Sequence, residues 1–141
     1  MESIPFDQVP EACKQLLNNA TTNPRMYISL ASAKLQKDGL SIVYHIEIGI
    51  ESGVVVNVNN VHLAHTTLEQ FNSYVVDYFK GNPHIIEFPT KKSLDVLDQT
   101  IANRTKDKIQ EYFIQLLRIP GFFLFEPFLK MFGLDPSFFV I

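Results

Sequence analysis

Apolar residues occupy every second position over residues 40–50, and polar residues such as His45 and Glu47 stand between them. This period of two is typical of a β-strand with one face in the core. Residues 26–33 suit a preceding strand. The Asp-Gly pair at residues 38–39 predicts a tight hairpin turn between the two strands.

A third strand is predicted after a turn at residues 52–53. Its apolar residues keep the period of two over residues 54–58, and the apolar phase then shifts by one position to Val61 and Leu63. We interpret this shift as a β-bulge at residues 59–60, because one extra residue reverses which side chains face the core. The three strands would form an antiparallel meander.

The period changes from two to about 3.6 after the strands, which predicts helices. We expect helices over residues 68–79 and 101–117, and a short, largely apolar helix over residues 122–132. The apolar stripe of the first helix consists of Leu68, Phe71, Tyr74, Val75, Tyr78 and Phe79. Thr66 or Thr67 is the expected N-cap of this helix. An extended connection over residues 82–96 joins the first two helices. The predicted fold class is α+β, a three-stranded antiparallel β-meander packed against a helical subdomain.

The length of 141 residues suits one domain,. All the elements above fall within residues 25–134. Residues 1–24 are predicted to be an N-terminal lead-in with a short helix over residues 10–17. Residues 135–141 form an apolar C-terminal tail that folds back, docks on a partner, or marks the chain as an excerpt of a longer protein, and we favour the excerpt.

Composition and charge exclude several functional classes. The net charge of -3 argues against a nucleic-acid binder,. A single cysteine, Cys13, cannot form an internal disulfide, so we expect a cytoplasmic protein. No apolar run is long enough to span a membrane, so any membrane contact would be peripheral. We find no catalytic pair, phosphate loop or metal-ligand spacing, and therefore expect no enzyme activity, cofactor or metal.

Three local segments, in this order of elements, resemble the PX (Phox homology) domain. Residues 66–71 (TTLEQF) stand where that family has a run like Arg-Arg-Tyr-Ser-Asp-Phe. Residues 88–91 (FPTK) resemble its Leu/Phe-Pro-Pro-Lys element, and the helix led by Arg104 resembles its second helix. The likeness spans about residues 25–134.

The resemblance implies a sorting-nexin-like module that binds phosphoinositide headgroups and recruits proteins to endosomal or other organelle membranes in trafficking or tethering. In the family, an Arg and a Tyr at the end of the third strand, a Lys after the proline element and an Arg on the second helix hold the headgroup. Lys91 and Arg104 match the last two. The altered positions of the family's first run are Thr66, Thr67 and Leu68, of which Thr67 and Leu68 replace the Arg-Tyr pair.

Replacement of the Arg-Tyr pair predicts weak, absent or altered phosphoinositide binding. A Thr hydroxyl cannot replace the bidentate, charge-assisted bonds of an Arg on a phosphate. Such bonds contribute about 1.5–3 kcal/mol, so binding would weaken by roughly one to two orders of magnitude. The alternative function is a protein-interaction domain that keeps the fold without lipid binding and uses the sheet edge or the Phe-rich C-terminus.

Further residues are candidates for membrane contact. Lys92, Lys108 and His65 would form an auxiliary basic face on an anionic surface, and an ordinary solvated surface is the alternative. His62 and His65 would add positive charge at acidic pH, although exposure to water is the commoner role of such strand-end histidines. Three apolar residues after the proline element form a candidate membrane-insertion loop, with packing beneath the loop as the alternative: Leu94, Val96 and Leu97.

Overall fold

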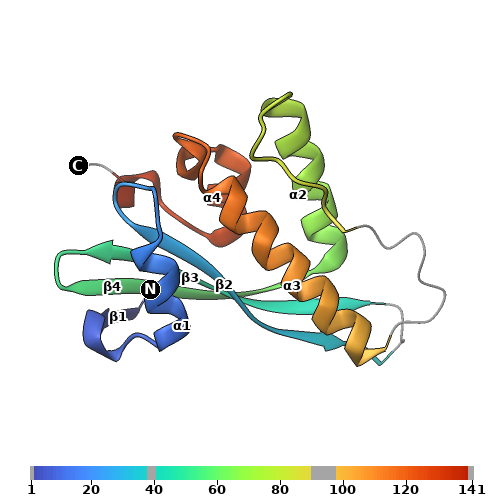
Figure 1. The fold of residues 1–141 in the computed structure, drawn as a ribbon, viewed down its shortest axis with the longest axis horizontal. Coiled ribbons are helices and arrows are strands. Elements are labelled where there is room, and N and C mark those ends of the chain that lie inside the picture. Colours follow the sequence, from blue (N-terminus) through green and yellow to red (C-terminus); the bar gives the residue numbers. More distant parts are fainter. Residues whose placement is uncertain (1, 38–40, 90–97, 140–141) are drawn as a thin grey trace.

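The computed structural model describes residues 2–37, 41–89 and 98–139 (Figure 1). It has an α+β fold, as expected, with a four-stranded antiparallel sheet in the order β1-β4-β3-β2. The strands are β1 (Glu2–Pro5), β2 (Met26–Leu35), β3 (Ile42–Ser52) and β4 (Val55–Ala64). The prediction of three strands was wrong, because β1 from the expected lead-in pairs with the start of β4.

Four α-helices and three short 3-10 helices complete the described chain: α1 (Glu11–Asn18), α2 (His65–Tyr78), α3 (Gln99–Leu116), α4 (Glu126–Phe132), η1 (Phe6–Gln8), η2 (Phe122–Leu124) and η3 (Pro136–Phe139). Figure 1 shows α2, α3 and α4 on one side of the long strands. In the same view α1 and β1 lie beside the chain's N-terminus, at the left end of the sheet. The expected helices over residues 68–79 and 101–117 are present, but α2 begins at His65 with Ala64 as its N-cap. Thr66 and Thr67 therefore lie inside the helix, and their expected capping role was wrong. The single helix expected over residues 122–132 is instead η2 followed by α4, which begins at Glu126.

The main core lies between the sheet and the three later helices. The predicted alternation in β3 is confirmed, because Tyr44, Ile46 and Ile48 are fully buried on this face. Aromatic residues of the later helices, such as Phe113 and Phe132, pack edge to face with ring centroids 6.0 Å apart. Such aromatic pairs contribute energy beyond the area that they bury.

A second, smaller core covers the opposite face of the sheet at one end. It consists of Val9, Cys13, Leu17, Tyr27, Val56 and Val58. The ring of Tyr27 lies so close to Gly49 that a Cβ atom there would collide with it. The Tyr27 hydroxyl donates a hydrogen bond to the Glu47 carboxylate at 2.7 Å. Residues of the expected lead-in are thus packed against the sheet.

The two cores explain the shift of apolar phase in β4 without a bulge. The register between β3 and β4 is continuous from Val43↔Ala64 to Ser52↔Val55, so the predicted bulge at residues 59–60 was wrong. Val56 and Val58 face the smaller core, whereas Val61 and Leu63 pack against the main core. The smaller core thus covers one face of β4 near its start, and the main core covers the other face near its end. The structure instead has a bulge in β2, between Leu30 and Ser32,.

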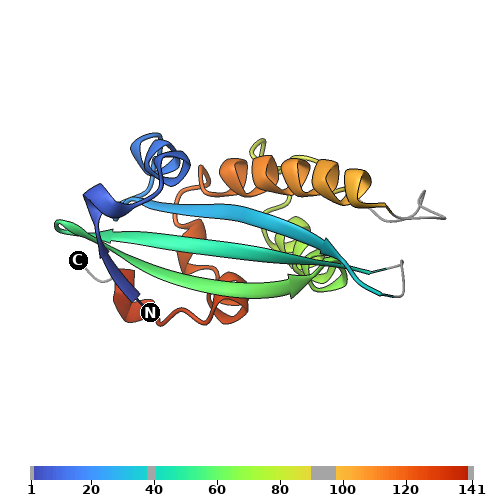
Figure 2. The same cartoon turned by 90° about the horizontal axis from the view of Figure 1, so that it is seen from below.

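Helix α3 runs along the free edge of β2 (Figure 2), and glutamine side chains of the helix bind that edge. The Gln110 amide accepts a hydrogen bond from the Leu30 N–H at 2.8 Å and donates one to the Ile28 carbonyl at 2.7 Å. Gln99 donates to the Ala33 carbonyl at 2.8 Å. An edge strand covered in this way is protected from pairing with another chain.

Candidate functional site

The three segments that carry the PX resemblance meet around Phe88. Its ring lies 5.4 Å from that of His65 at the start of α2 and 5.1 Å from that of Tyr112 on α3, between centroids. A hydrogen bond of 2.8 Å joins the Tyr44 hydroxyl to His65 Nδ1. The Tyr112 hydroxyl donates to Asn72 on α2 at 2.7 Å. The ring contacts of Phe88 and the hydrogen bond between Tyr112 and Asn72 thus tie α2, the proline element and α3 together.

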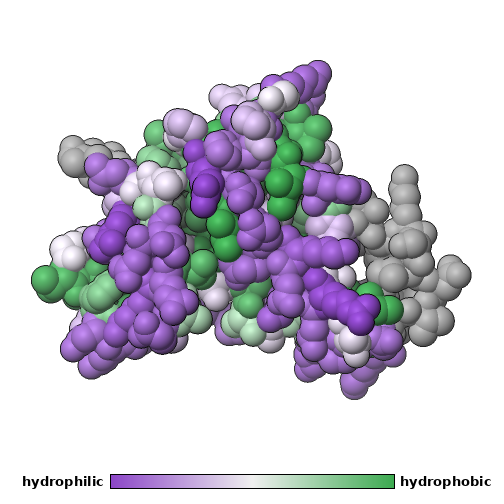
Figure 3. Space-filling model, viewed as in Figure 1, coloured by the Kyte–Doolittle hydropathy of each residue, from purple (hydrophilic) through white to green (hydrophobic). Residues whose placement is uncertain are grey.

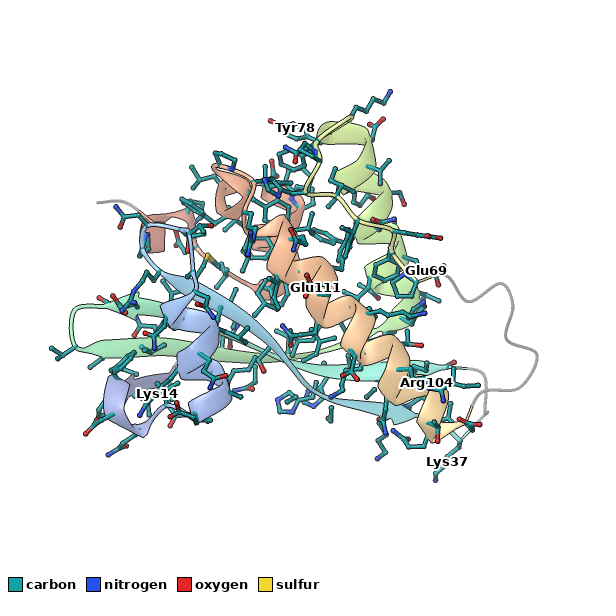
Figure 4. All side chains as sticks on the ribbon, viewed as in Figure 1. Lys14, Lys37, Glu69, Tyr78, Arg104 and Glu111 are labelled. Carbon is teal, nitrogen blue, oxygen red and sulfur yellow. The ribbon has the colours of Figure 1, made fainter. Side chains whose placement is uncertain are left out.

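Arg104 and Lys108 are exposed on the same flank of α3 as Tyr112, because residues four apart lie one above the other on a helix,. Gln110 is two residues from Lys108, about half a turn away, and it faces β2,. The two cations therefore lie on the side of α3 that Tyr112 turns toward α2. Within residues 2–37, 41–89 and 98–139, neither cation forms an ion pair. We call Arg104 and Lys108 the α3 basic face; Figure 4 labels Arg104.

Leu68, at the position that the PX resemblance aligns with a Tyr, is a core residue with no exposed surface. It packs with Phe71 and Val75 in the main core, so its side chain is not available to cover an inositol ring. Thr66, by contrast, is exposed. The position that the resemblance assigns to ring stacking is used here for packing.

Thr67, which the PX resemblance aligns with a phosphate-binding Arg, faces α4 and not the α3 basic face. It lines a groove of about 510 Å³ between α2 and α4. The groove is lined by Thr67, Gln70, Phe71, Tyr74, Glu126, Pro127, Lys130 and Met131. The structure therefore does not bring Thr67 and Arg104 together.

The groove continues into a second hollow of about 470 Å³ that shares Tyr74, Glu126 and Pro127. Exposed apolar side chains gather here, since Tyr74 is 49% exposed, Tyr78 72% and Leu124 55%. We call the two hollows the α2–α4 groove. Sequence analysis missed it, because Tyr74 and Tyr78 were assigned to the apolar stripe of the helix. The apolar stripe of α2 covers more of the helix surface than the core can bury. This surplus of apolar residues is the feature of the sequence that could have indicated the groove.

Apolar side chains are less frequent on the face formed by α1 and α3. Figure 3 shows this face as largely hydrophilic, with smaller apolar patches in the centre, toward α2 and at the left edge. The surface on the α3 side thus differs in chemistry from the α2–α4 groove.

A carboxylate lies on the flank of α2 near His65. Glu69 Oε1 is 3.6 Å from His65 Nε2, and the Glu69 side chain is 35% exposed. Burial raises the pKa of the Tyr44 hydroxyl, and the negative charge of Glu69 raises it further,. The same charge would repel a phosphate at this end of α2.

The histidines near the start of α2 differ from one another. His65 is 3% exposed, so the expectation that it is exposed to water was wrong, and it contributes nothing to an auxiliary basic surface. Its hydrogen bond to Tyr44 and its contact with Phe88 place it under the proline element. His62 is exposed, as expected, and stacks on His45.

Several predicted site residues lie outside the described residues, which end at Pro89 and resume at Asp98. These are Lys91, Lys92, Leu94, Val96 and Leu97.

The Asp98 side chain caps α3 by accepting a hydrogen bond from the Ile101 N–H at 2.8 Å,.

The chain matches no protein-family model and no curated protein. Among the described residues, no helix is both long and apolar enough to cross a membrane. The same part of the chain contains no group of three His, Cys, Asp or Glu side chains placed to hold a metal ion.

Proposed function

We propose that the chain is a non-catalytic, PX-like module that recruits a protein to a membrane in trafficking or organelle tethering, and that its phosphoinositide binding is weak and altered. The observation that carries the proposal is the meeting of α2, the proline element and α3 around Phe88, beside the exposed Arg104 and Lys108. Two exposed cations on one helix flank are suited to an anionic headgroup,.

Three features support weak binding without selectivity for a 3-phosphate. Leu68 is buried in the core. Thr67 lies in the α2–α4 groove and not beside Arg104. Glu69 adds a negative charge near the start of α2. Each of the family's two strand-end contacts is thus missing, and a repulsive group lies nearby.

The expected strength of membrane contact follows from the α3 basic face. Each Lys or Arg close to an anionic membrane contributes about 1 kcal/mol. Arg104 and Lys108 together would contribute about 2 kcal/mol, which is too little for stable recruitment on its own. We therefore propose that the chain binds peripherally to the cytoplasmic surface of endosomal or other organelle membranes. Stable recruitment would need a second contact with the same membrane.

Vesicle flotation tests the role of the α3 basic face. The Arg104→Ala/Lys108→Ala variant should bind vesicles containing anionic lipid at least tenfold more weakly than the wild type. The matched control is Lys14→Ala/Lys106→Ala, which removes the same charge from α1 and from another flank of α3. Equal losses in the two double variants would contradict a localised lipid-binding face.

The α2–α4 groove favours a second candidate function, a protein-interaction domain. The free edge of β2 is already covered by Gln99 and Gln110. Phe122, Phe128 and Phe132 near the C-terminus are fully buried. The exposed Tyr74 and Tyr78 instead offer aromatic anchors for an apolar helix of a partner protein.

Imaging in cells separates the two functions. If a fluorescent fusion loses its organelle association through Tyr74→Ala/Tyr78→Ala and keeps it in Arg104→Ala/Lys108→Ala, the protein-interaction function is correct. The opposite result supports the membrane-recruitment function.

A further inference from the structure

His45 and His62 form a pair on the sheet face opposite α2, α3 and α4. They are direct partners in the register of β3 and β4, and their rings stack with centroids 4.7 Å apart and an interplanar angle of 15°. The Phe6 N–H donates to the Val54 carbonyl, so the backbone groups of even-numbered β4 residues, His62 included, point away from β3. Facing residues in such a non-hydrogen-bonded pair have their side chains especially close.

Asn60 determines which nitrogen of His45 is available. Its side-chain oxygen lies 2.8 Å from His45 Nε2 and accepts a hydrogen bond from it. The proton is then on Nε2, and the lone pair of the neutral ring is on Nδ1. Among the described residues, His45 Nδ1 and both ring nitrogens of His62 have no hydrogen-bond partner. A ring that donates one N–H to a carbonyl oxygen and keeps its other nitrogen open has the usual arrangement of a metal-binding histidine.

We propose that His45 and His62 form a surface site for one divalent transition-metal ion, such as Cu²⁺, Ni²⁺ or Zn²⁺. The two imidazoles bind the ion, and water completes the coordination. The exposed His62 ring turns out of the stack so that one nitrogen of each ring approaches the ion, at the usual metal–nitrogen distance of about 2.0–2.1 Å. Asn60 positions His45 and is not itself a ligand.

The surroundings of the pair are compatible with an open, two-ligand site. Glu47, two residues from His45 on the same face, accepts the Tyr27 hydroxyl at its Oε2 at 2.7 Å. Among the described residues, no group of three His, Cys, Asp or Glu is placed to hold a metal ion, so the pair has no third side-chain ligand. The Glu47 carboxylate still contributes a negative charge near the pair, which favours a cation. Imidazole ligands with vacant positions suit Cu²⁺ best, and Ni²⁺ and Zn²⁺ less, in the usual order of affinities.

Calorimetric titration of the metal-free full chain with NiCl₂, CuCl₂ or ZnCl₂ in a non-coordinating buffer tests the site. We expect one ion per chain and a higher melting temperature in its presence. His45→Asn and His62→Asn should each weaken binding at least tenfold, because each removes one of two ligands. Asn60→Ala should weaken it to a smaller extent, and imidazole NMR signals of His45 and His62 alone should shift.

The matched control is His84→Asn, which removes an imidazole from the connection after α2 and should leave the affinity unchanged. Circular dichroism establishes that each variant is folded before the titration. The proposal is overturned if either single variant at the pair binds as tightly as the wild type, if the wild type binds no ion, or if one ion is shared by two chains.

Discussion

The two flanks of α2 differ in chemistry and in what they can bind. The flank toward α3 carries Glu69 and Asn72 and is held by polar contacts such as the bond from the Tyr112 hydroxyl. The flank toward α4 carries Thr67 and Tyr74 and forms the wall of an open, apolar groove. The position that the PX resemblance aligns with a phosphate-binding Arg therefore falls on the flank that lies away from the α3 basic face.

The start of the helix explains this difference. Because α2 begins at His65, residues 66–68 are helical, and each is turned about 100° from the one before,. Thr67 is thereby directed to α4 and Leu68 to the core. A motif matched by sequence alone does not establish which way its side chains point, and a shift of a few residues in a helix start changes their partners.

The largest expected effect is on stability and distinguishes the core from the groove. Leu68→Ala should lower the free energy of unfolding by about 2–5 kcal/mol, because it leaves a cavity in the main core. Thr67→Ala, next to it on the groove flank, should change the free energy by less than about 0.5 kcal/mol. Urea denaturation measures both. Similar values for the two variants would mean that Leu68 is not the core residue of this pair.

Two buried tyrosines, Tyr44 and Tyr112, lead us to expect a loss of stability at alkaline pH. Burial raises the pKa of Tyr112, and burial followed by the charge of Glu69 raises that of Tyr44. Because the folded-state pKa exceeds the unfolded value of about 10, the stabilisation is complete below pH 10 and is lost as the pH rises toward the folded pKa. For each buried tyrosine, the free energy of unfolding should fall by about 1.4 kcal/mol per pH unit above pH 10. Tyr112→Phe should reduce this slope, which urea melts at a series of pH values measure.

The charge of the α3 flank should limit lipid binding. Glu69→Gln removes a negative charge near the α3 basic face and should strengthen binding to anionic vesicles by about 1 kcal/mol, or roughly fivefold. Glu11→Gln, on α1, is the control for net charge. Flotation at low and high salt measures the effect, which salt should diminish. An equal gain in both variants would show that only net charge matters.

The smallest expected effect is the most informative about the motif. Thr67→Arg introduces the residue that the PX resemblance expects at the phosphate-binding position, yet we expect less than a twofold gain in affinity for phosphatidylinositol 3-phosphate. The new guanidinium would start from the groove flank, away from Arg104. A tenfold or larger gain in a vesicle-binding titration would show that the side chain reaches the headgroup and that the flank assignment is wrong.

Local patterns in the sequence predicted the elements whose burial is one-sided. The alternation in β3 and the helical stripes of α2 and α3 are of this kind. The four residues of β1 are too few for a pattern, and their pairing with β4 is a long-range contact. The shift at residues 59–60 allowed two explanations, a bulge or a change of covered face, and only the tertiary packing distinguishes them.

The candidate site was less predictable than the fold. Spacing placed Arg104 and Lys108 on one face of a helix, and the structure agrees. The burial of His65 depends on Tyr44 and Phe88, which are distant in sequence. The α2–α4 groove depends on where α4 packs, and no local pattern encodes that position.

Weak membrane recruitment without selectivity for a 3-phosphate can be tested on vesicles that differ only in the anionic lipid. Equilibrium binding of the wild-type chain is measured on two sets of vesicles of equal surface charge, one with phosphatidylinositol 3-phosphate and one with phosphatidylserine. We predict weak binding to both, equal within about threefold and reduced by salt. A micromolar Kd with at least tenfold preference for the 3-phosphate, or no binding to either set, would contradict the account.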